Sequence, residues 1–426
     1  MNVLAKTCRY YKTYGAHFFW IRLKGVIQDY VFGALAPIFN RHMVIPHAHC
    51  ECGDSMPDVI LLAGIEWELR KQRPQQLAFA LAEKGCRVHY CAPYSCASRV
   101  SGWRSHMPSA RHAVFHVRFF ARQRKSLGAL LDAALEADMR ASLNAYVASL
   151  AQNNAVLLLV EHPLWHEFID WQKNFFCIYD CIDDYGDFVD AHPATNSCEQ
   201  RLALSAGAIT CTAQHLADKF TGKANVSLAR NACEYSHFVR PFPAERDSGR
   251  RKVIGYHGAI AEWFDVDLLA MAAREFSEHT FLLVGAYSSE ARERLAGLKN
   301  VELVGEVEYK RLPLYVHTFD VGLLPFRIQP LTLNTNPVKV YEYLAAGLPV
   351  VAAPLPEMNQ FGELVATGEG QGFIDALRQT LAQPETMEAF SARQHFARQH
   401  TWEKRADDLL NVYRKHATGP NAQVTT

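Results

Sequence analysis

Short apolar runs that alternate with helix-like stretches are the feature that most constrains how this chain folds. The run "VILLAG" (59–64) ends in Gly, "RPQQLAFALAEKG" (73–85) has Pro near a helix start and a Gly stop, and "RVHYCAP" (87–93) is a second strand candidate. Strands this apolar are typical of a parallel sheet that is covered by helices on both faces. The pattern predicts an α/β fold.

The alternation recurs in two blocks. Strand and helix candidates of the first block continue at 155–163, 164–174, 175–183, 207–212, 213–220 and 225–231. The stretch "FVRPFPAERDSGRRK" (238–252) has prolines, a glycine and charges but no apolar period, so we interpret it as a linker. Candidates of the second block follow at 252–258, 267–276, 280–286, 301–307, 312–319, 320–326 and 336–352.

Two α/β domains in tandem therefore fit the pattern, with a site expected in the cleft between them. The length of 426 residues allows two cores, since a domain usually holds about 100–200 residues. The expected parts are an N-terminal extension at 1–57, a first domain at 58–240, a second domain at 241–400, and a C-terminal helix and tail at 401–426. The amphipathic C-terminal helix would close either domain.

Composition excludes several classes of protein. Lys plus Arg and Asp plus Glu number 44 each, so no global positive field marks a nucleic-acid binder. The eleven cysteines are scattered without a framework spacing, which is typical of reduced thiols in the cytoplasm. The longest apolar run, "VFGALAPIF" (31–39), falls short of the roughly 20 residues that a membrane-spanning helix needs.

The segment "RYYKTYGAHFFWIRLKG" (9–25) mixes basic and aromatic residues. This mixture suits the headgroup zone of an anionic membrane, which would place a cytoplasmic protein peripherally at the inner membrane face. The alternative is that the segment packs against the body of the protein. A removable targeting peptide is less favoured, because no small-residue cleavage site follows a clean apolar stretch.

The stretch "NPVKVYEYLAAGLPVVA" (336–352) predicts a short helix that runs into a buried strand. Asn336 suits the cap and Pro337 the first helical position. Lys339 and Glu342 share one face. A helix N-terminus attracts anions, so Lys339 would add a cation for phosphate and Glu342 would accept hydrogen bonds from ribose hydroxyls. The alternative is an ordinary Lys–Glu pair on a solvated face.

Polar residues also follow two apolar strands of the first block. "EHPLW" supplies His162, and "YDCIDDYGDF" supplies Asp180, Asp183 and Asp184. The carboxyl edge of such a sheet is where α/β sites gather, so these groups are candidates to orient a hydroxyl or to act as a base. The alternative is that they cap helices and turns.

Two further residues are candidates for an acceptor site. Gly64 would let an acceptor or a phosphate approach the backbone, or it is a plain strand-to-loop turn. Arg73 would bind an acceptor or phosphate, or it is a solvated residue at a helix start. No metal is expected, because "HAHCEC" (47–52) lacks the spacing of a zinc site. The stretch "GEGQG" (368–372) lacks the spacing of a dinucleotide-binding loop, so we interpret it as an ordinary loop.

Several stretches together carry a family resemblance. They are "RNACEYSHF" (230–238), "GYHGAIAEWFD" (255–265), "FLLVG" (281–285), "NVELVGEVEYKRLPLYVHTFDVGLLPF" (300–326) and the stretch at 336–352. Over roughly residues 58–416 the chain resembles the GT-B glycosyltransferases, particularly the family-1-like bacterial polysaccharide type. The resemblance implies two Rossmann-like domains with parallel sheets facing a central cleft. The second domain would hold a nucleotide-sugar and the first would present the acceptor.

The resemblance also implies roles for single residues. Glu342 resembles the second Glu of the family's Glu-x7-Glu motif, which binds ribose, whereas the first Glu falls at Asn334, so any contact to a sugar hydroxyl there differs in kind. Gly258 resembles the glycine that lets the backbone approach the donor phosphates. Asn336 is a further candidate for binding the donor.

This chain departs from the family at the loop "HGAIAEWFDVD" (257–267), which lacks the usual Arg and Lys for the diphosphate. Arg327 and Lys339 are the expected substitutes, with a solvated loop position as the alternative for Arg327. Within the loop, Trp263 reads as a core residue and Asp265 as a helix cap.

The resulting expectation is a glycosyltransferase that moves a sugar from a nucleotide-sugar to a glycan or lipid-linked acceptor in cell-surface polysaccharide biosynthesis. The resemblance implies retention of the anomeric configuration and no required metal, so no cofactor is expected. The balanced charge favours no nucleic-acid partner. The alternatives are a catalytically degenerate GT-B binding or scaffold subunit, motivated by Asn334 and the missing loop cations, and a nucleotide-sugar epimerase.

Overall fold

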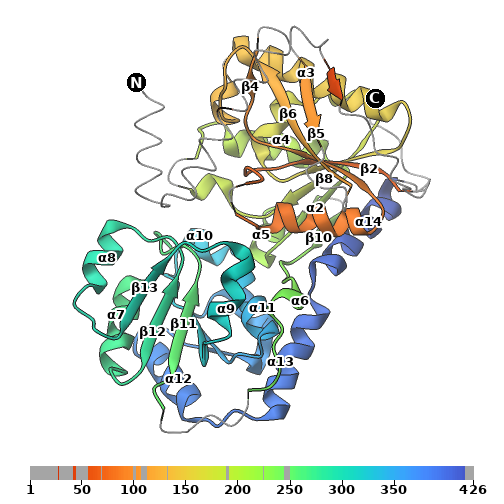
Figure 1. Cartoon of the computed structure of the whole chain (residues 1–426). Coiled ribbons are helices and arrows are strands. Elements are labelled where there is room, and N and C mark those ends of the chain that lie inside the picture. The colour runs from red at the N-terminus through yellow and green to blue at the C-terminus, as the bar shows by residue number, and fades with distance from the viewer. Residues whose placement is uncertain are drawn as a thin grey trace. The chain divides into compact units, whose positions relative to one another are not determined.

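The protein is described from a computed structural model (Figure 1). It describes residues 27, 42–44, 56–68, 70–98, 102–106, 113–131, 133–188, 191–223, 225–243 and 250–417. The chain divides into two compact units. The N-terminal unit comprises the described residues of 20–230 and 403–426, and the C-terminal unit comprises those of 231–402.

The N-terminal unit is built on a sheet that has ten strands in the described residues, in the order β1-β5-β6-β3-β2-β7-β8-β9-β10, with β4 beside β6. Its strands are β1 His42–Val44, β2 Asp58–Leu62, β3 Arg87–Cys91, β4 Cys96–Ala97, β5 Trp103–His106, β6 Val114–Ala121, β7 Val156–Val160, β8 Phe176–Cys181, β9 Ala208–Cys211 and β10 Val226–Leu228. All described pairs are parallel except β5–β6. Strands β2 and β7 are buried at every residue, which explains their unbroken apolar runs.

Helices cover both faces of this sheet. They are α2 Arg73–Glu83, η1 Gly128–Leu130, α3 Ala133–Ala151, η2 Pro163–Phe168, η3 Tyr185–Asp187, α4 Thr195–Ser205, α5 Gln214–Asp218 and α14 Trp402–Ala417. On one face η2 contacts both α3 and α4. Helix α14 lies beside α2, where Lys84 binds Asp407 at 2.6 Å, and its Tyr413 packs against Phe176. From Glu403 onward the C-terminal helix therefore belongs to the N-terminal unit.

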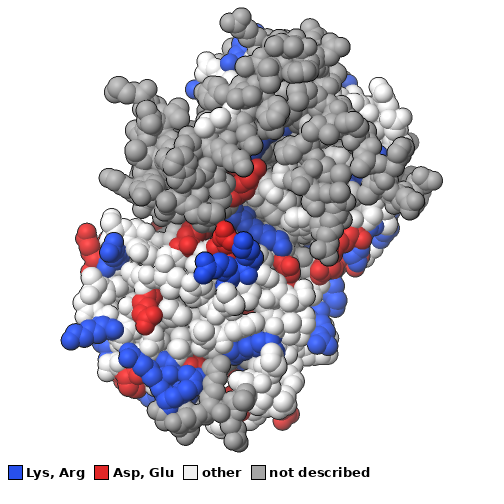
Figure 2. Space-filling model, viewed as in Figure 1, with Lys and Arg blue, Asp and Glu red and all other residues white. Residues whose placement is uncertain are grey.

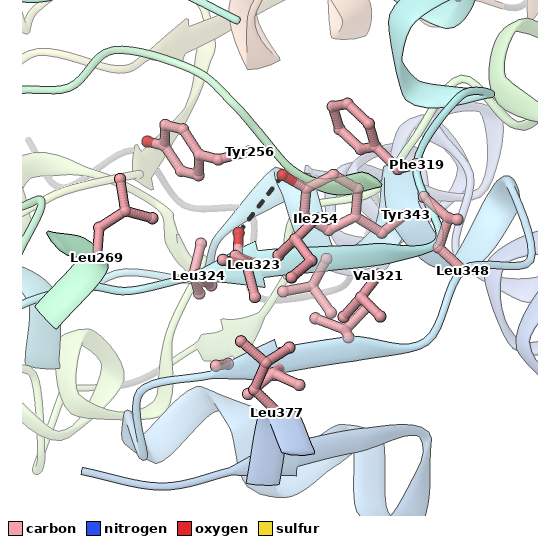
Figure 3. Packing of buried hydrophobic residues seen from close by; sticks show 14 of the residues in the cluster. Ile254, Tyr256, Leu269, Phe319, Val321, Leu323, Leu324, Tyr343, Leu348 and Leu377 are labelled. Carbon is pink, nitrogen blue, oxygen red and sulfur yellow. Dashed lines mark hydrogen bonds between the residues drawn. The ribbon is translucent and has the colours of Figure 1, made fainter. Parts of the chain in front are cut away.

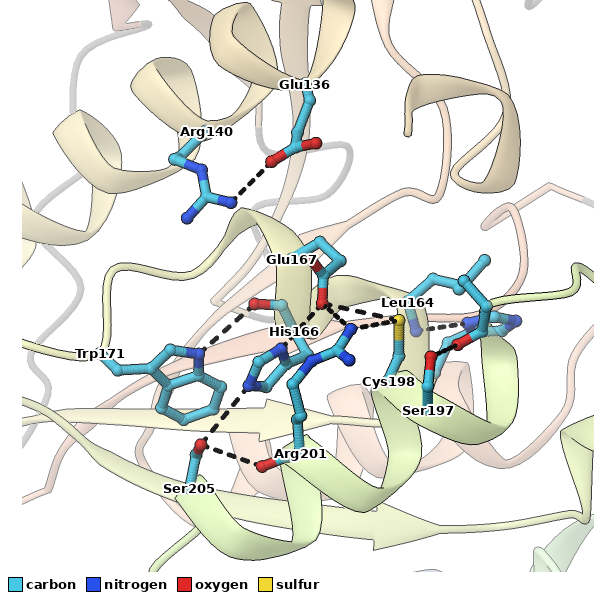
Figure 4. A network of polar contacts seen from close by, with 12 residues as sticks. Glu136, Arg140, Leu164, His166, Glu167, Trp171, Ser197, Cys198, Arg201 and Ser205 are labelled. Atoms are coloured by element: carbon cyan, nitrogen blue, oxygen red, sulfur yellow. Dashed lines mark hydrogen bonds and ion pairs between the residues drawn. The ribbon is translucent and has the colours of Figure 1, made fainter. Parts of the chain in front are cut away.

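The helix predicted over 164–174 is instead the 3-10 turn η2, which ends at Phe168. The reason is a tertiary contact with α3. Asn144 donates to the carbonyl of Phe168 at 2.9 Å and accepts from the backbone N–H of Asp170 at 2.8 Å, so those backbone groups are withdrawn from helical bonding. Figure 4 shows the polar network that joins η2 to α4, in which Glu167 binds Arg201.

The C-terminal unit holds a parallel sheet, with six strands in its described residues, in the order β13-β12-β11-β14-β15-β16. Its strands are β11 Val253–His257, β12 Thr280–Val284, β13 Val301–Gly305, β14 Val321–Leu324, β15 Val350–Ala352 and β16 Val365–Thr367. Strand order reverses between β11 and β14. This is the doubly wound arrangement, in which ligands bind beyond the carboxyl ends of the strands at the reversal.

Helices cover both faces here as well (Figure 1). They are α6 Tyr235–Phe238, α7 Val266–Glu275, α8 Ser289–Leu295, η4 Tyr309–Arg311, α9 Leu312–Val316, α10 Pro330–Leu333, α11 Val338–Ala345, η5 Pro356–Leu364, α12 Gln371–Ala382 and α13 Met387–Gln399. Helix α12 joins α7 through Arg378 and Glu275, 2.7 Å apart, while α11 packs between α6 and α13. Figure 3 shows Tyr343 of α11 inserted among the buried residues of β11 and β14.

The boundary between the units differs from the expected one at 240/241, because residues 231–240 bond within the C-terminal unit. The backbone N–H of Asn231 donates to Asn336 at 2.9 Å. Arg240 donates to the carbonyls of Ala346 and His317 at 2.8 and 2.6 Å. These contacts tie the expected linker to the sheet that follows it.

Several expectations about the start of the chain fall outside the described residues. The segment at 9–25 and the cluster His47, His49, Cys50 and Cys52 are among them. In the part of the chain that is described, no helix combines the length and the apolar character needed to cross a membrane. The eight cysteines among those residues are buried free thiols.

Candidate functional site

The reversal point of the C-terminal sheet is held together by Tyr343. Strands β11 and β14 pair through Ile254 with Val321 and Gly255 with Gly322. Beyond these pairs the Tyr343 hydroxyl accepts from the His257 N–H at 3.0 Å. It donates to the Leu323 carbonyl at 3.4 Å (Figure 3). A side chain of α11 thus bridges the two strands where their backbones part.

Gly258 follows β11 at this point, as the sequence predicted. Its φ is +127°, and an added Cβ would lie 2.1 Å from Cε of Lys339. Gly285, which follows β12, has φ +150°, and a Cβ there would lie 2.0 Å from the carbonyl oxygen of Gly258. Only glycine tolerates both the backbone angle and the close approach.

Lys339 lies in the first turn of α11, directly beside Gly258. Its Nζ is 5.8 Å from the ring centroid of Tyr256 and 5.7 Å from that of Phe326, within the range of a cation–π contact. The side chain is half-buried. The structure therefore brings Lys339 and Gly258 together at the reversal point of the sheet.

Glu342 lies one turn further along α11 and is 6% exposed. Its Oε2 is 3.1 Å from Nε2 of His257, the last residue of β11, which is also buried. A solvated position for Glu342 is therefore wrong. The sequence reasoning did not single out His257, because a histidine at the end of an apolar strand carries no signal of a tertiary partner.

Asn336 does not cap α11, contrary to the prediction, because Pro337 occupies the cap position. The Asn336 side chain is buried and bonds elsewhere. Its oxygen accepts from the Asn231 N–H at 2.9 Å and from the Tyr341 hydroxyl at 3.1 Å, and its nitrogen donates to Glu357 at 2.8 Å. These bonds order the loop before α11, a role that sequence reasoning missed for Glu357.

The remaining donor-side candidates lie in the loops around this point. Arg327 has an exposed side chain, and its backbone N–H donates to the Trp263 carbonyl at 2.8 Å. Asn334 ends α10 and is partly buried. Asp265 caps α7 as predicted, because its side chain accepts from the Leu268 N–H at 2.9 Å.

The N-terminal sheet has its own reversal point, between β2 and β7. Gly64 and His162 follow these two strands. A Cβ added at Gly64 would lie 2.9 Å from the Tyr185 hydroxyl and 3.5 Å from the His162 side chain. The rings of His162 and Tyr185 are 4.3 Å apart between centroids. The structure therefore brings these three residues together.

His162 is neutral at physiological pH. Burial lowers its pKa to about 4. Its Nδ1 accepts from the backbone N–H of Leu164 at 3.2 Å, which caps η2 and assigns the ring proton to Nε2. The predicted alternative of a capping role is confirmed, and Nε2 is a hydrogen-bond donor.

Arg73 is not solvated. It is 4% exposed, and its guanidinium donates to both carboxylate oxygens of Asp180 at 2.8 and 2.9 Å. The Thr210 hydroxyl also donates to Asp180 at 2.7 Å. Arg73 and Asp180 thus form a bidentate pair that joins α2 to β8 inside the unit.

The two carboxylates that follow Asp180 differ in their surroundings. Burial and the neighbouring Asp184 raise the pKa of Asp183 to about 7, against the opposing effect of Arg73. Asp184 accepts from Lys219 at 2.9 Å, and Lys219 also binds Glu199 at 2.9 Å. A pKa of about 7 makes Asp183 a carboxyl that changes protonation near neutral pH.

Glu161 is a fourth acid at this edge that the sequence reasoning missed. It extends β7, since its N–H donates to the Leu62 carbonyl at 3.1 Å. Its side chain is fully buried, and neither carboxyl oxygen has a hydrogen-bond partner in the described residues. Burial, with the nearby charge of Asp180, raises its pKa well above the ordinary value. The sequence did offer a signal for Glu161, since the Glu of "EHPLW" directly follows an apolar strand.

Comparison with known proteins gives these features a family context. Residues 251–383 match the family model described as "Glycosyl transferases group 1". This stretch of the C-terminal unit is therefore similar to group 1 glycosyltransferases. The reversal point with Gly258, Lys339 and Glu342 lies within it. Within the described residues, no group of three or more His, Cys, Asp or Glu side chains is placed to hold a metal ion.

One curated relative is TuaH of Bacillus subtilis (strain 168), named provisionally as a teichuronic acid biosynthesis glycosyltransferase. It is 28% identical over 266 residues, which cover 56% of this chain. The match spans 66% of that protein, just under two thirds of its length.

Solved structures show the fold of the two described units. Sucrose-phosphate synthase from Thermosynechococcus elongatus superimposes with a TM-score of 0.65 at 17% identity, covering 84% of this chain and 99% of that one. Anabaena HepE, in complex with UDP and glucose, gives a TM-score of 0.58 at 14% identity, covering 84% and 100%. The two α/β units have the GT-B fold, as expected.

Proposed function

We propose that this protein is a glycosyltransferase that moves a sugar from a nucleotide-sugar to a hydroxyl of a glycan or lipid-linked acceptor in cell-surface polysaccharide biosynthesis. The observation that carries the proposal is the convergence of Gly258, Lys339 and Glu342 at the reversal point of a unit similar to group 1 glycosyltransferases. The GT-B fold and the similarity to TuaH support it.

The donor diphosphate is assigned to the turn at Gly258. The missing side chain allows the backbone to approach an anion, and the N-terminus of α11 with Lys339 supplies compensating positive charge without a required metal. The exposed Arg327 offers a second cation from the neighbouring loop. Glu342 is assigned to the ribose. UDP is the first nucleotide to test, since it is the one bound to HepE.

The acceptor hydroxyl is assigned to the N-terminal unit. Asp183, with its pKa of about 7, is suited to accept the hydroxyl proton near neutral pH. The neutral His162 offers Nε2–H to a sugar oxygen, and Tyr185 against Gly64 shapes the same edge. During transfer the bond between the sugar C1 and the diphosphate breaks, and a bond between C1 and the acceptor oxygen forms with retention. The diphosphate leaves with its charge balanced by Lys339 and α11.

The test is nucleoside diphosphate release from UDP-, GDP- and TDP-sugars in the presence of lipid-linked acceptors. Lys339→Ala and Glu342→Ala should each suppress release by about tenfold or more, as expected for lost charge-assisted contacts. Lys310→Ala is the control, because Lys310 is 77% exposed and pairs with Glu308. Full turnover in both site variants would sink the assignment of the donor site.

A binding or scaffold subunit is the second candidate, favoured by Asn334 at the position where the family has a carboxylate. It predicts nucleotide binding without turnover. Calorimetry with UDP beside the release assay separates the two candidates, because tight binding with no release from any donor would favour the subunit. Asn334→Glu should then restore release if the missing carboxylate is the cause.

A further inference from the structure

The contact between His257 and Glu342 is the least expected feature of the C-terminal unit. Both side chains are buried, at 4% and 6% exposure, and their Nε2 and Oε2 atoms are 3.1 Å apart. One residue ends β11 and the other lies in α11, so the contact joins the two elements that frame the reversal point. Packing of apolar surface does not require such a pair, since burying polar groups is costly unless they are matched.

The imidazole of His257 is held in place by its neighbours. Its backbone N–H donates to the Tyr343 hydroxyl at 3.0 Å. The ring of Phe238 lies nearly parallel to it, at 16° and 6.3 Å between centroids, and the ring of Tyr343 meets it edge-on at 5.0 Å. The two ring contacts set the orientation of the imidazole, and Nε2 faces the carboxylate.

The distance from Nε2 of His257 to Oε2 of Glu342 is short, but the two groups are not aligned for a hydrogen bond. The atom lies within ion-pair distance of Glu342, yet it makes no hydrogen bond of good geometry to any described residue. Hydrogen bonds of functional groups are often misaligned before a ligand binds and tighten in the complex. A carboxylate that turns to meet a ligand on one oxygen can align its other oxygen with a fixed donor.

We propose that His257 is a positioning residue that holds Oε2 of Glu342, so that Oε1 accepts hydrogen bonds from a ribose diol. This role belongs to the proposed donor site and rests on the proposed function. The ligand class is a ribonucleoside diphosphate, and deoxythymidine diphosphate, which lacks one of the two hydroxyls, binds more weakly. The donors expected are UDP- or GDP-sugars rather than TDP-sugars.

Coupling between His257 and the ribose hydroxyls can be measured. An interaction routed through the ribose disappears when the ribose hydroxyls are removed, whereas a general loss of folding affects every nucleotide alike. His257→Phe keeps an aromatic ring between Phe238 and Tyr343 but removes the nitrogen. His257→Gln keeps an N–H donor on a side chain of similar reach.

The experiment is calorimetric binding of UDP, 2′-deoxy-UDP, 3′-deoxy-UDP and deoxythymidine diphosphate to the full chain. Wild type should bind UDP about tenfold more tightly than the deoxy nucleotides. His257→Phe should weaken UDP binding about tenfold and leave at least one deoxy nucleotide unchanged, and His257→Gln should recover part of the loss. His395→Phe, at an exposed position on α13, should change neither.

The outcomes separate the two proposals. Absence of binding of every nucleotide to wild type would overturn the donor site itself. Binding of UDP by wild type, together with equal losses for UDP and both deoxy nucleotides in the His257 variants, would leave the donor site standing and overturn the role of His257. That role would also be overturned if both variants bind UDP as wild type does. Melting temperatures measured alongside show that each variant is folded.

Discussion

Glu161 is a buried acid whose burial lowers the stability of the folded protein when the unfolded chain can ionise it. Its carboxyl is fully buried without a hydrogen-bond partner among the described residues, and its pKa is well above the ordinary value of 4.5. The folded protein therefore keeps this group protonated where the unfolded chain ionises it. His162 works in the opposite sense, since its pKa of about 4 costs stability as pH falls below 6.5.

Replacing Glu161 by Gln should remove one part of the pH dependence of stability. The contribution of Glu161 to wild-type stability falls as pH rises above 4.5, because the unfolded state then releases the proton that the folded state retains. Glu161→Gln should match wild type near about pH 4 and exceed it increasingly toward about pH 8. Urea unfolding at several pH values measures this, with the exposed Glu83→Gln as control. A constant difference across pH would contradict the assignment of a buried neutral acid.

Gly258 is the residue at which backbone and site meet. Gly258→Ala should lower the free energy of unfolding by about 1–3 kcal/mol, because alanine is strained at positive φ. It should also weaken UDP binding, because the new Cβ would lie 2.1 Å from Cε of Lys339 and displace it. Gly297→Ala is the matched control, since nothing lies within 4 Å of a Cβ there. Unchanged UDP affinity in Gly258→Ala would argue against a phosphate at this turn.

Helix α11 is the element on which the C-terminal site depends. Its buried face supplies Tyr343 to the sheet, and its partly exposed first turn supplies Lys339. The loop before it is held by Asn336 and Glu357, 2.8 Å apart, rather than by a side-chain cap. Tertiary hydrogen bonds thus replace the local capping that the sequence pattern suggested.

Tyr343→Phe tests the bridge that this helix makes between β11 and β14. Losing the hydroxyl leaves the His257 N–H and the Leu323 carbonyl without that partner, so the free energy of unfolding should fall by about 1–3 kcal/mol. Tyr315→Phe is the control, because among the described residues the Tyr315 hydroxyl makes no hydrogen bond. Equal stability of the two variants in urea would show that the bridge contributes nothing.

At the scale of the whole molecule, the chain leaves the N-terminal unit at residue 230 and returns to it at 403. Helix α14 buries Ala406, Leu409 and Leu410 there. The sequence left open which domain this amphipathic helix would close. The answer depended on tertiary contacts with the first unit, such as that of Tyr413 with Phe176, and these form only when the first sheet has folded.

Deleting residues 403–426 should therefore destabilise the N-terminal unit selectively. Amide hydrogen exchange is expected to accelerate in β2, α2 and β8 while β11 to β16 keep their protection. A chain that lacks only 418–426 is the control. Equal acceleration in both units would contradict the assignment of α14 to the first.

Strands such as β2 and β7 were predictable to within a few residues, because burial on both faces demands unbroken apolar runs. Strand β6 was missed, although it is buried at every residue. Gly258 and Lys339 were predictable because each sits at a fixed place relative to a strand end or a helix start. The end of η2 was not predictable, because Asn144 on a distant helix ends it. Arg73 was misread for the same reason, since Asp180 is far away in the sequence.

The order of apolar strands, turn glycines and helix starts lies in the chain itself, because backbone geometry and the burial of apolar side chains act over short stretches. From these alone follow two α/β units and the edges where their sites gather. Which side chains meet at those edges is a matter of long-range packing. The pairing of His257 with Glu342, the isolation of Glu161 and the return of α14 each require elements distant in sequence to come together, and no local pattern encodes that.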